Sequence, residues 1–223
     1  MSMVTGGGSL IRSSLLPPGL RFRIKPLTTM TLTKKHLEFE ASCRQIIGLT
    51  ICKVEYVEIP VESTNSTPFF YYPTRFPNLH SVDFSIYLHA ETGQIAEIFW
   101  GAQFYQYDLC LELSASSINQ PADNSFRRTV DVSRSDLWAK FIGTRITDMK
   151  IHWESFRTIR WESFRMTEII VYPQDFQLTF SNNHTVFISL ADLHQGDDEV
   201  FKGSDNVMVT DNEELARQVK MID

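Results

Sequence analysis

The sequence predicts a mainly β protein in which two sheets pack as a sandwich or close into a barrel. Apolar and polar residues alternate in several stretches after residue 46, which places successive side chains on opposite faces of a strand. Turn signals separate these stretches into pairs, and the order of signals repeats once along the chain. The 223 residues are 43% hydrophobic and 22% charged, a balance typical of a globular protein that buries a core without disulfides.

Two β-hairpins are the clearest local prediction. Strand-like stretches at 82–88 and 176–180 each lead into a turn signal, Ala-Glu-Thr-Gly at 90–93 and Ser-Asn-Asn at 181–183. Gly and Asn tolerate the positive φ that tight hairpin turns require. A further apolar strand follows each turn, so both hairpins are expected to belong to antiparallel sheets.

The two halves of the chain resemble each other. Ile-Gly-Leu-Thr-Ile at 47–51 matches Ile-Gly-Thr-Arg-Ile at 142–146, which is 95 residues later. We interpret this and the weaker matches that follow as a tandem duplication of a four-strand unit. The halves would span about 39–113 and 137–215, with a linker rich in Ser, Asn and Asp at 114–136. One four-strand sheet would expose an apolar face, so the two sheets are expected to form a single domain, 33–223.

Two short helices are expected outside the strands. Ser133 and Asp136 stand at capping-box spacing before an apolar run, which predicts a helix near 134–141. Thr210 precedes an acidic first turn, which predicts a second helix over 211–220. The segment 33–45 fits either a strand or a helix.

Residues 1–32 differ from the rest of the chain. They contain no Asp or Glu, and glycines and prolines interrupt them, so we expect a disordered basic head. Three origins fit this composition: a tag, an over-long start upstream of Met30, or a transit-like segment.

The charge is uneven along the chain. There are 21 basic and 27 acidic residues, and six of the basic ones precede the first acid, Glu38, so the remainder has a net charge of −12. An acidic body repels phosphate backbones, so we expect no nucleic-acid partner and favour a basic protein partner. No apolar run approaches the ~18 residues of a membrane span. Three widely spaced cysteines suit a reducing compartment, so a cytoplasmic protein without a membrane partner is expected.

One group of candidate binding residues is acidic. Residues 192–223 contain nine acids and three bases, and such a surface would complement a basic groove on a partner. The acids of this group are Asp197, Asp198, Glu199, Asp211, Glu213 and Glu214. A solvated acidic face that keeps the protein soluble is the alternative interpretation.

A second group lies in a duplicated motif. Trp-Glu-Ser-Phe-Arg at 153–157 recurs at 161–165, and a shift of eight residues keeps every side chain on its original face of an extended strand. The duplication predicts an elongated hairpin or strand that the first half lacks. Trp and Arg dominate binding hot spots, so the candidates on this protruding arm are Trp153, Arg157, Trp161 and Arg165. Alternatively, the tryptophans simply cover the sheet.

No strong catalytic motif is present, so we predict no catalytic residue, metal site or cofactor. The leading hypothesis is a non-catalytic, acidic, β-rich protein-binding domain, such as an inhibitor or immunity-type partner of a basic protein. A first alternative is a small-molecule-binding barrel, or an enzyme of unknown reaction, that uses His194, Asp197 and the 100–107 stretch. A second alternative is a structural subunit of a homo-oligomer in which the arm, residues 153–165, pairs edge to edge.

Overall fold

The computed structural model describes residues 31–60, 72–115, 126–160, 165–193 and 196–222, apart from the side chains of 72–73, 156–160 and 165–168. Two compact units are distinguished, Met1–Thr31 and Leu32–Asp223, and the second is described below. The prediction of a disordered head therefore falls almost entirely outside the described residues.

The described part of the chain is mainly β, as predicted. In chain order its elements are α1 (Lys34–Cys43), η1 (Arg44–Ile46), β1 (Ile51–Glu58), β2 (Tyr72–Pro73), β3 (His80–Val82), β4 (Ser85–Ala90), β5 (Gln94–Gly101), β6 (Asp108–Ala115), β7 (Arg128–Asp131), β8 (Ile146–Arg160), β9 (Arg165–Phe180), β10 (Thr185–Asp192), β11 (Phe201–Thr210) and α2 (Glu213–Gln218).

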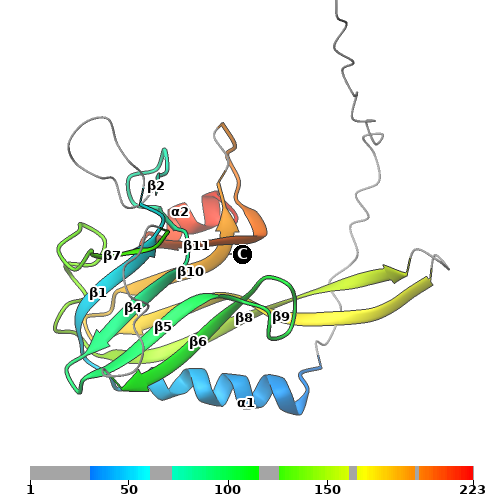
Figure 1. The fold of residues 1–223 in the computed structure, drawn as a ribbon, viewed down its shortest axis with the longest axis horizontal. Helices are drawn as coiled ribbons and strands as arrows, with labels where there is room; N and C mark the ends of the chain where they lie inside the picture. The colour runs from blue at the N-terminus through cyan, green and yellow to red at the C-terminus, as the bar shows by residue number, and fades with distance from the viewer. Residues whose placement is uncertain (1–30, 61–71, 116–125, 161–164, 194–195, 223) are drawn as a thin grey trace, which may run out of the picture. The chain divides into compact units, whose positions relative to one another are not determined.

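Two antiparallel sheets contain all of these strands. The first has the order β6-β5-β4-β1-β7 and the second has the order β2-β3-β11-β10-β9-β8. Figure 1 shows the sheets as two layers, and a single apolar core with residues from both sheets lies between them. Each sheet ends in edge strands instead of closing on the other, so the architecture is a sandwich and the barrel alternative is wrong.

Each sheet is built around one half of the chain. The first contains the meander β1-β4-β5-β6, and the second contains the meander β8-β9-β10-β11. Two short strands depart from this division of the chain. β3 comes from the first half but pairs with β11, and β7 lies in the segment expected to be only a linker but pairs with β1.

The two segments that match at an offset of 95 residues pair with each other. The Gly48 N–H donates to the carbonyl of Ile146 at 2.8 Å, and the Gly143 N–H donates to the carbonyl of Ile51 at 2.7 Å. Each of these bonds is therefore the counterpart of the other after a shift of 95 residues. A second reciprocal pair of bonds follows the same rule, so the halves meet across a local two-fold axis.

Alanine at Gly48 or at Gly143 is expected to lower the free energy of unfolding by about 1–2 kcal/mol in each case. Both glycines have positive φ, +98° and +76°, and a Cβ placed on either would meet no atom within 4 Å. The cost is therefore backbone strain without a clash, and it should be similar at the two equivalent positions. Urea unfolding of the two single variants measures it, and an unchanged midpoint for either variant would contradict the assignment.

The helix predictions are only partly correct. α2 forms where expected, but its N-cap is Asn212, whose side chain accepts a hydrogen bond from the N–H of Leu215 at 3.0 Å, and not Thr210. The segment 134–141 forms consecutive turns and not a helix, and the hydroxyl of the predicted cap Ser133 instead accepts a hydrogen bond from the N–H of Val54 at 2.9 Å. The ambiguous segment 33–45 contains helix α1.

Candidate functional site

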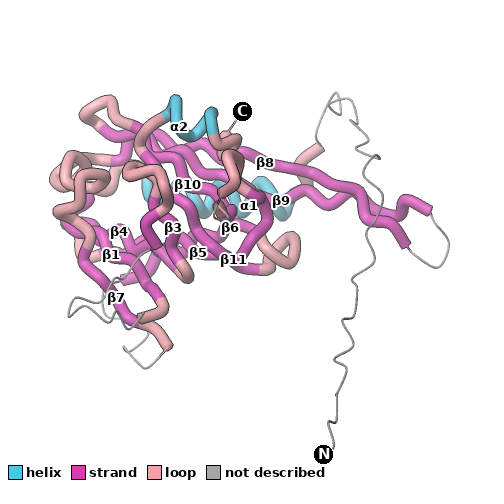
Figure 2. Tube along the Cα trace, turned by 90° about the horizontal axis from the view of Figure 1, so that it is seen from above, coloured by secondary structure: helices cyan, strands magenta, loops and turns pink. Residues whose placement is uncertain are grey.

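The hairpin of β8 and β9 extends beyond its sheet. β8 pairs with β9 from Ile146 to Arg160, whereas β9 pairs with β10 only over residues 175–179. In the structure this arm extends beyond the predicted 153–165: it comprises residues 153–160 and 165–173, which have no third strand beside them in the described part of the chain. Figures 1 and 2 show the arm reaching past the other strands. The elongated hairpin predicted from the duplicated motif is thus present in the second half only.

The two copies of the motif do not lie on one strand. The first copy lies in β8, which ends at Arg160, and β9 begins at the last residue of the second copy, Arg165. The expectation that both copies keep the same faces of one strand is therefore wrong. Trp161 lies outside the described residues, and so do the side chains of Arg157 and Arg165.

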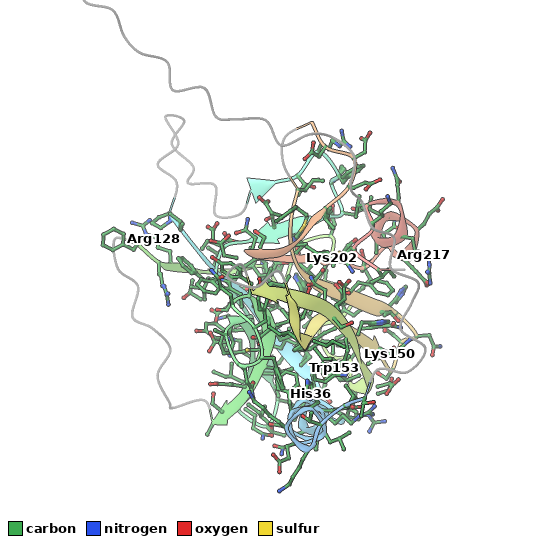
Figure 3. All side chains as sticks on the ribbon, turned by 90° about the vertical axis from the view of Figure 1, so that its right-hand side faces the viewer. His36, Arg128, Lys150, Trp153, Lys202 and Arg217 are labelled. Atoms are coloured by element: carbon green, nitrogen blue, oxygen red, sulfur yellow. The ribbon has the colours of Figure 1, made fainter. Side chains whose placement is uncertain are left out.

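Trp153 lies where the arm leaves the body. Its ring is half-buried, and its centroid is 5.0 Å from that of His36 on α1 and 5.7 Å from that of Phe104. Phe104 stacks on His36 at 4.7 Å, and Phe39 completes this cluster, the aromatic base. Figure 3 shows His36 and Trp153 close together. Trp153 therefore packs on its neighbours and anchors the arm to the body.

His36 caps one edge of the arm. The N–H of Thr33 donates to Nδ1 of His36 at 3.1 Å, so Nδ1 is an acceptor and Nε2 carries the proton. Nε2 lies 3.1 Å from the carbonyl oxygen of Val171 in β9 and donates to it. Sequence reasoning missed this residue, because the two partners are 135 positions apart.

A buried carboxylate holds the loop that carries Phe104. Asp108 accepts hydrogen bonds from the N–H groups of Gln103 at 3.2 Å and Tyr105 at 3.0 Å, and from that of Phe104. Three donors on one carboxylate fix the loop backbone. The loop then presents Phe104 to the aromatic base and Tyr105 to the ring of Tyr172, whose centroid is 5.6 Å away.

A row of polar side chains crosses the opposite, outer face at the same level. It contains one residue from each of four neighbouring strands: Glu154 of β8, Asp175 of β9, Ser189 of β10 and Lys202 of β11. Ser189 donates to Oδ1 of Asp175. Nζ of Lys202 lies 2.5 Å from Oε1 of Glu154 and 3.3 Å from Oδ2 of Asp175. This polar row joins β11 to both strands of the arm.

The polar row contains a buried ionisable acid, and a buried acceptor without a hydrogen-bond partner lies next to it. Burial raises the pKa of Asp175 to about 7, although Lys202 and Ser189 act against it. Burial alone would lower the pKa of Lys202, but the neighbouring carboxylates raise it above its ordinary value. Next to Asp175, the buried amide of Gln174 donates to the carbonyl of Leu190 at 2.6 Å, while its Oε1 has no hydrogen-bond partner in the described structure.

The chemistry of these groups does not favour catalysis. Ser189 is completely buried and its hydroxyl is engaged by Asp175, so the hydroxyl is closed to a substrate. Burial raises the pKa of Cys43 to about 12 and also raises that of Cys110, which keeps both thiols protonated near neutral pH. Among the residues that the structure describes, no three side chains form a group able to hold a metal ion.

The six candidate acids lie in the β10–β11 connection and around α2, and most of them are already paired. The ion pairs are Asp198 with Arg75, Glu199 with Lys220, Asp211 with Lys140, and Glu213 with Arg217. In the described ranges, Asp197 and Glu214 make no ion pair. Exposed pairs contribute only about 0–1 kcal/mol each to stability, but their cations weaken the field that a basic partner would encounter.

The ligand-site alternative can be followed only in part, in the residues that the structure describes. His194 lies outside the described residues, and Asp197 is exposed. Trp100 is half-buried and donates its indole N–H to the carbonyl of Asp83 at 3.1 Å. His80, a neighbour of Asp83 in sequence, instead contacts the hydroxyl of Tyr56 at 3.0 Å. Since the sheets do not close, the barrel mouth that this alternative requires does not exist.

Fold and site together define a class of protein: an antiparallel two-sheet sandwich with a β-ribbon that projects from one sheet. No family model matches the chain, and comparisons with curated proteins and with solved structures give no significant match. In the described residues, no helix is both long enough and apolar enough to cross a membrane.

Proposed function

We propose that this protein is a non-catalytic protein-binding domain that contacts its partner through the arm. The observation that carries this proposal is the pairing of the arm strands with each other alone in the described structure. The outer N–H and C=O groups of such a ribbon can form hydrogen bonds with an extended strand of a partner. The aromatic base on one face and the polar row on the other connect the ribbon to the body.

A basic protein remains the favoured partner. The chain has a net charge of −6, which accelerates encounter with a cationic surface even where individual acids are paired. Contact at the arm and electrostatic attraction by the whole molecule then contribute separately to partner binding. Its three cysteines, two buried and one exposed, are all free thiols, which supports our proposal of a reducing compartment such as the cytoplasm.

Shortening the arm is expected to abolish partner binding while the sandwich still folds. Residues 156–170 would be replaced by Asn-Gly, a two-residue hairpin turn that joins Ser155 to Val171 and leaves the aromatic base intact. Retention of the partner from a lysate of the source organism should fall by about tenfold or more, equivalent to about 1.4 kcal/mol of binding free energy. Circular dichroism and thermal melting verify that the body remains folded.

The matched control keeps the arm and removes the two acids without ion pairs, Asp197→Asn with Glu214→Gln. This variant should retain the partner at about 50 mM salt and lose part of it at about 500 mM salt, because exposed charges are screened. Undiminished retention by the shortened variant, combined with loss in the acid variant, would overturn the proposal in favour of the acidic surface.

A second copy of the chain is the other candidate partner, because β8 is an edge strand of its sheet. Pairing of arms would make the protein a structural subunit of a homo-oligomer. Light scattering of the full chain and of the shortened variant distinguishes this case, since an arm-mediated oligomer becomes monomeric when the arm is shortened.

A further inference from the structure

The strands of the second sheet are irregular at the level of the polar row. The register between β8 and β9 shifts after His152, where Gln174 is an extra residue on β9. The register between β10 and β11 shifts after Leu190, and the four residues 203–206 of β11 have no partner on β10. Bulges in neighbouring strands interrupt regular pairing and re-aim side chains. The sheet is therefore least regular where the arm joins it.

The same level carries buried groups that favour contact with water. Asp175 is 3% exposed, and Gln174 is completely buried with an unpartnered Oε1. A buried carboxylate and an unsatisfied acceptor each cost free energy that is recovered when the groups become hydrated. Local opening at the base of the arm would hydrate both groups at once.

Asp175 lies among groups from every strand packed beside it. The titratable and charged groups that face it are His152 and Glu154 on β8, Tyr172 on β9 and Lys202 on β11, and β10 contributes the hydroxyl of Ser189. Lys202 is the one Lys or Arg side chain among these described neighbours. It is shared between two carboxylates, so it compensates an ionised Asp175 only in part.

We infer that the base of the arm is a proton-controlled hinge, closed when Asp175 is protonated and increasingly open when its carboxyl group can ionise. The inference rests on the proposed function in one respect, namely that the arm is the binding element. A partner that needs the arm to reorient would then bind according to pH. The hinge itself is a property of the isolated chain.

The direction of the effect follows from the two protonation equilibria. The pKa of Asp175 is about 7 in the closed base, and an exposed Asp has a pKa of about 3.9. Between these values the open form releases its proton while the closed form retains it. The opening equilibrium constant therefore rises with pH from about 4 to about 7, by up to about tenfold per pH unit, and is constant above that range.

Hydrogen exchange measured by NMR on the full chain tests the hinge. Protection factors would be compared at about pH 5 and about pH 7 for the amides of Asp175 and Ser189, with the amide of Ile98 in the first sheet reporting global unfolding. The wild-type base is expected to open at least about tenfold more at the higher pH, while its amides stay less protected than that of Ile98 at both pH values. Asp175→Asn should remove this difference, whereas Asp205→Asn, an exposed acid on β11, should preserve it.

A second variant keeps the hinge testable if Asp175→Asn does not fold. Lys202→Gln removes the cation that lowers the pKa of Asp175, so the rise in opening should extend to higher pH. Protection at the arm base equal to that of Ile98 at both pH values, or opening that does not increase with pH, would overturn the hinge. No partner takes part in these measurements. The hinge can therefore be refuted while shortening of the arm still abolishes binding, and the binding proposal can be refuted while the hinge is confirmed.

Discussion

Glu58→Gln is expected to raise the free energy of unfolding by about 3–5 kcal/mol at about pH 8. Glu58 is completely buried at the end of β1, and its Oε1 has no hydrogen-bond partner. Burial and the neighbouring Asp83 carboxylate raise its pKa to about 10. Gln has nearly the same shape, and its amide N–H groups can donate to Asp83 without carrying a proton that titrates.

The sign of this effect follows from linkage. The unfolded chain loses the Glu58 proton near pH 4, with a pKa of about 4.3, whereas the folded chain keeps it to about pH 10. The contribution of Glu58 to wild-type stability is therefore complete below about pH 4 and decreases as pH rises to about 10. Urea unfolding at several pH values should show a gap between Glu58→Gln and wild type that widens with pH.

Glu214→Gln is the matched control for this series, because Glu214 is exposed on the first turn of α2. Its stability should follow that of the wild type within about 0.5 kcal/mol at every pH. If Glu58→Gln also followed the wild type at all pH values, Glu58 would be ionised in the folded protein and the assignment would be wrong.

The sequence was a good guide where structure depends on neighbouring residues. The turn signals at 90–93 and 181–183 form hairpin turns, and Gly93 and Asn183 adopt the expected positive φ of +83° and +63°. Alternation located the strands of both meanders, because successive side chains of a strand point to opposite faces of the sheet. These features need no knowledge of distant partners.

Pairing between distant segments was beyond such reasoning. β3 has three residues and joins β11, and so short a strand leaves no periodicity to read. The bond between His36 and Val171 spans 135 positions. No local pattern marks either partner. The sequence therefore indicates Trp153 and the elongated hairpin, but not the hydrogen bond by which His36 holds the arm.

Charge was the least reliable guide to the site. The sequence predicts an acidic surface near the C-terminus, where nine acids face three local bases, but the counter-ions of these acids also include Arg75 and Lys140, which lie far away in the sequence. Conversely, Asp175 stands in the sequence only as a polar member of an alternating strand. Its importance arises from burial and from Lys202, which comes from a strand two places away in the sheet.

Tyr56→Phe is expected to lower the free energy of unfolding by about 2–4 kcal/mol, because one hydroxyl group joins three separate parts of the fold. Tyr56 lies on β1 of the first sheet and accepts a hydrogen bond from the indole N–H of Trp138 at 2.5 Å. Its hydroxyl lies 3.0 Å from Nδ1 of His80 on β3 of the second sheet. Burial lowers the pKa of His80, which keeps the ring neutral and its Nδ1 able to accept.

The loss comes from the partners and not from the ring, since Phe fills the same space. Removing the hydroxyl leaves the buried indole N–H without this acceptor and Nδ1 without this donor, and each buried polar group that loses its partner costs about 1–3 kcal/mol. Tyr107→Phe is the control, because Tyr107 is half-buried and packs its ring against Trp100 at 6.1 Å. Chemical denaturation should show Tyr56→Phe to be clearly less stable than Tyr107→Phe. Equal stabilities would mean that the Tyr56 hydroxyl contributes nothing to joining these parts of the fold.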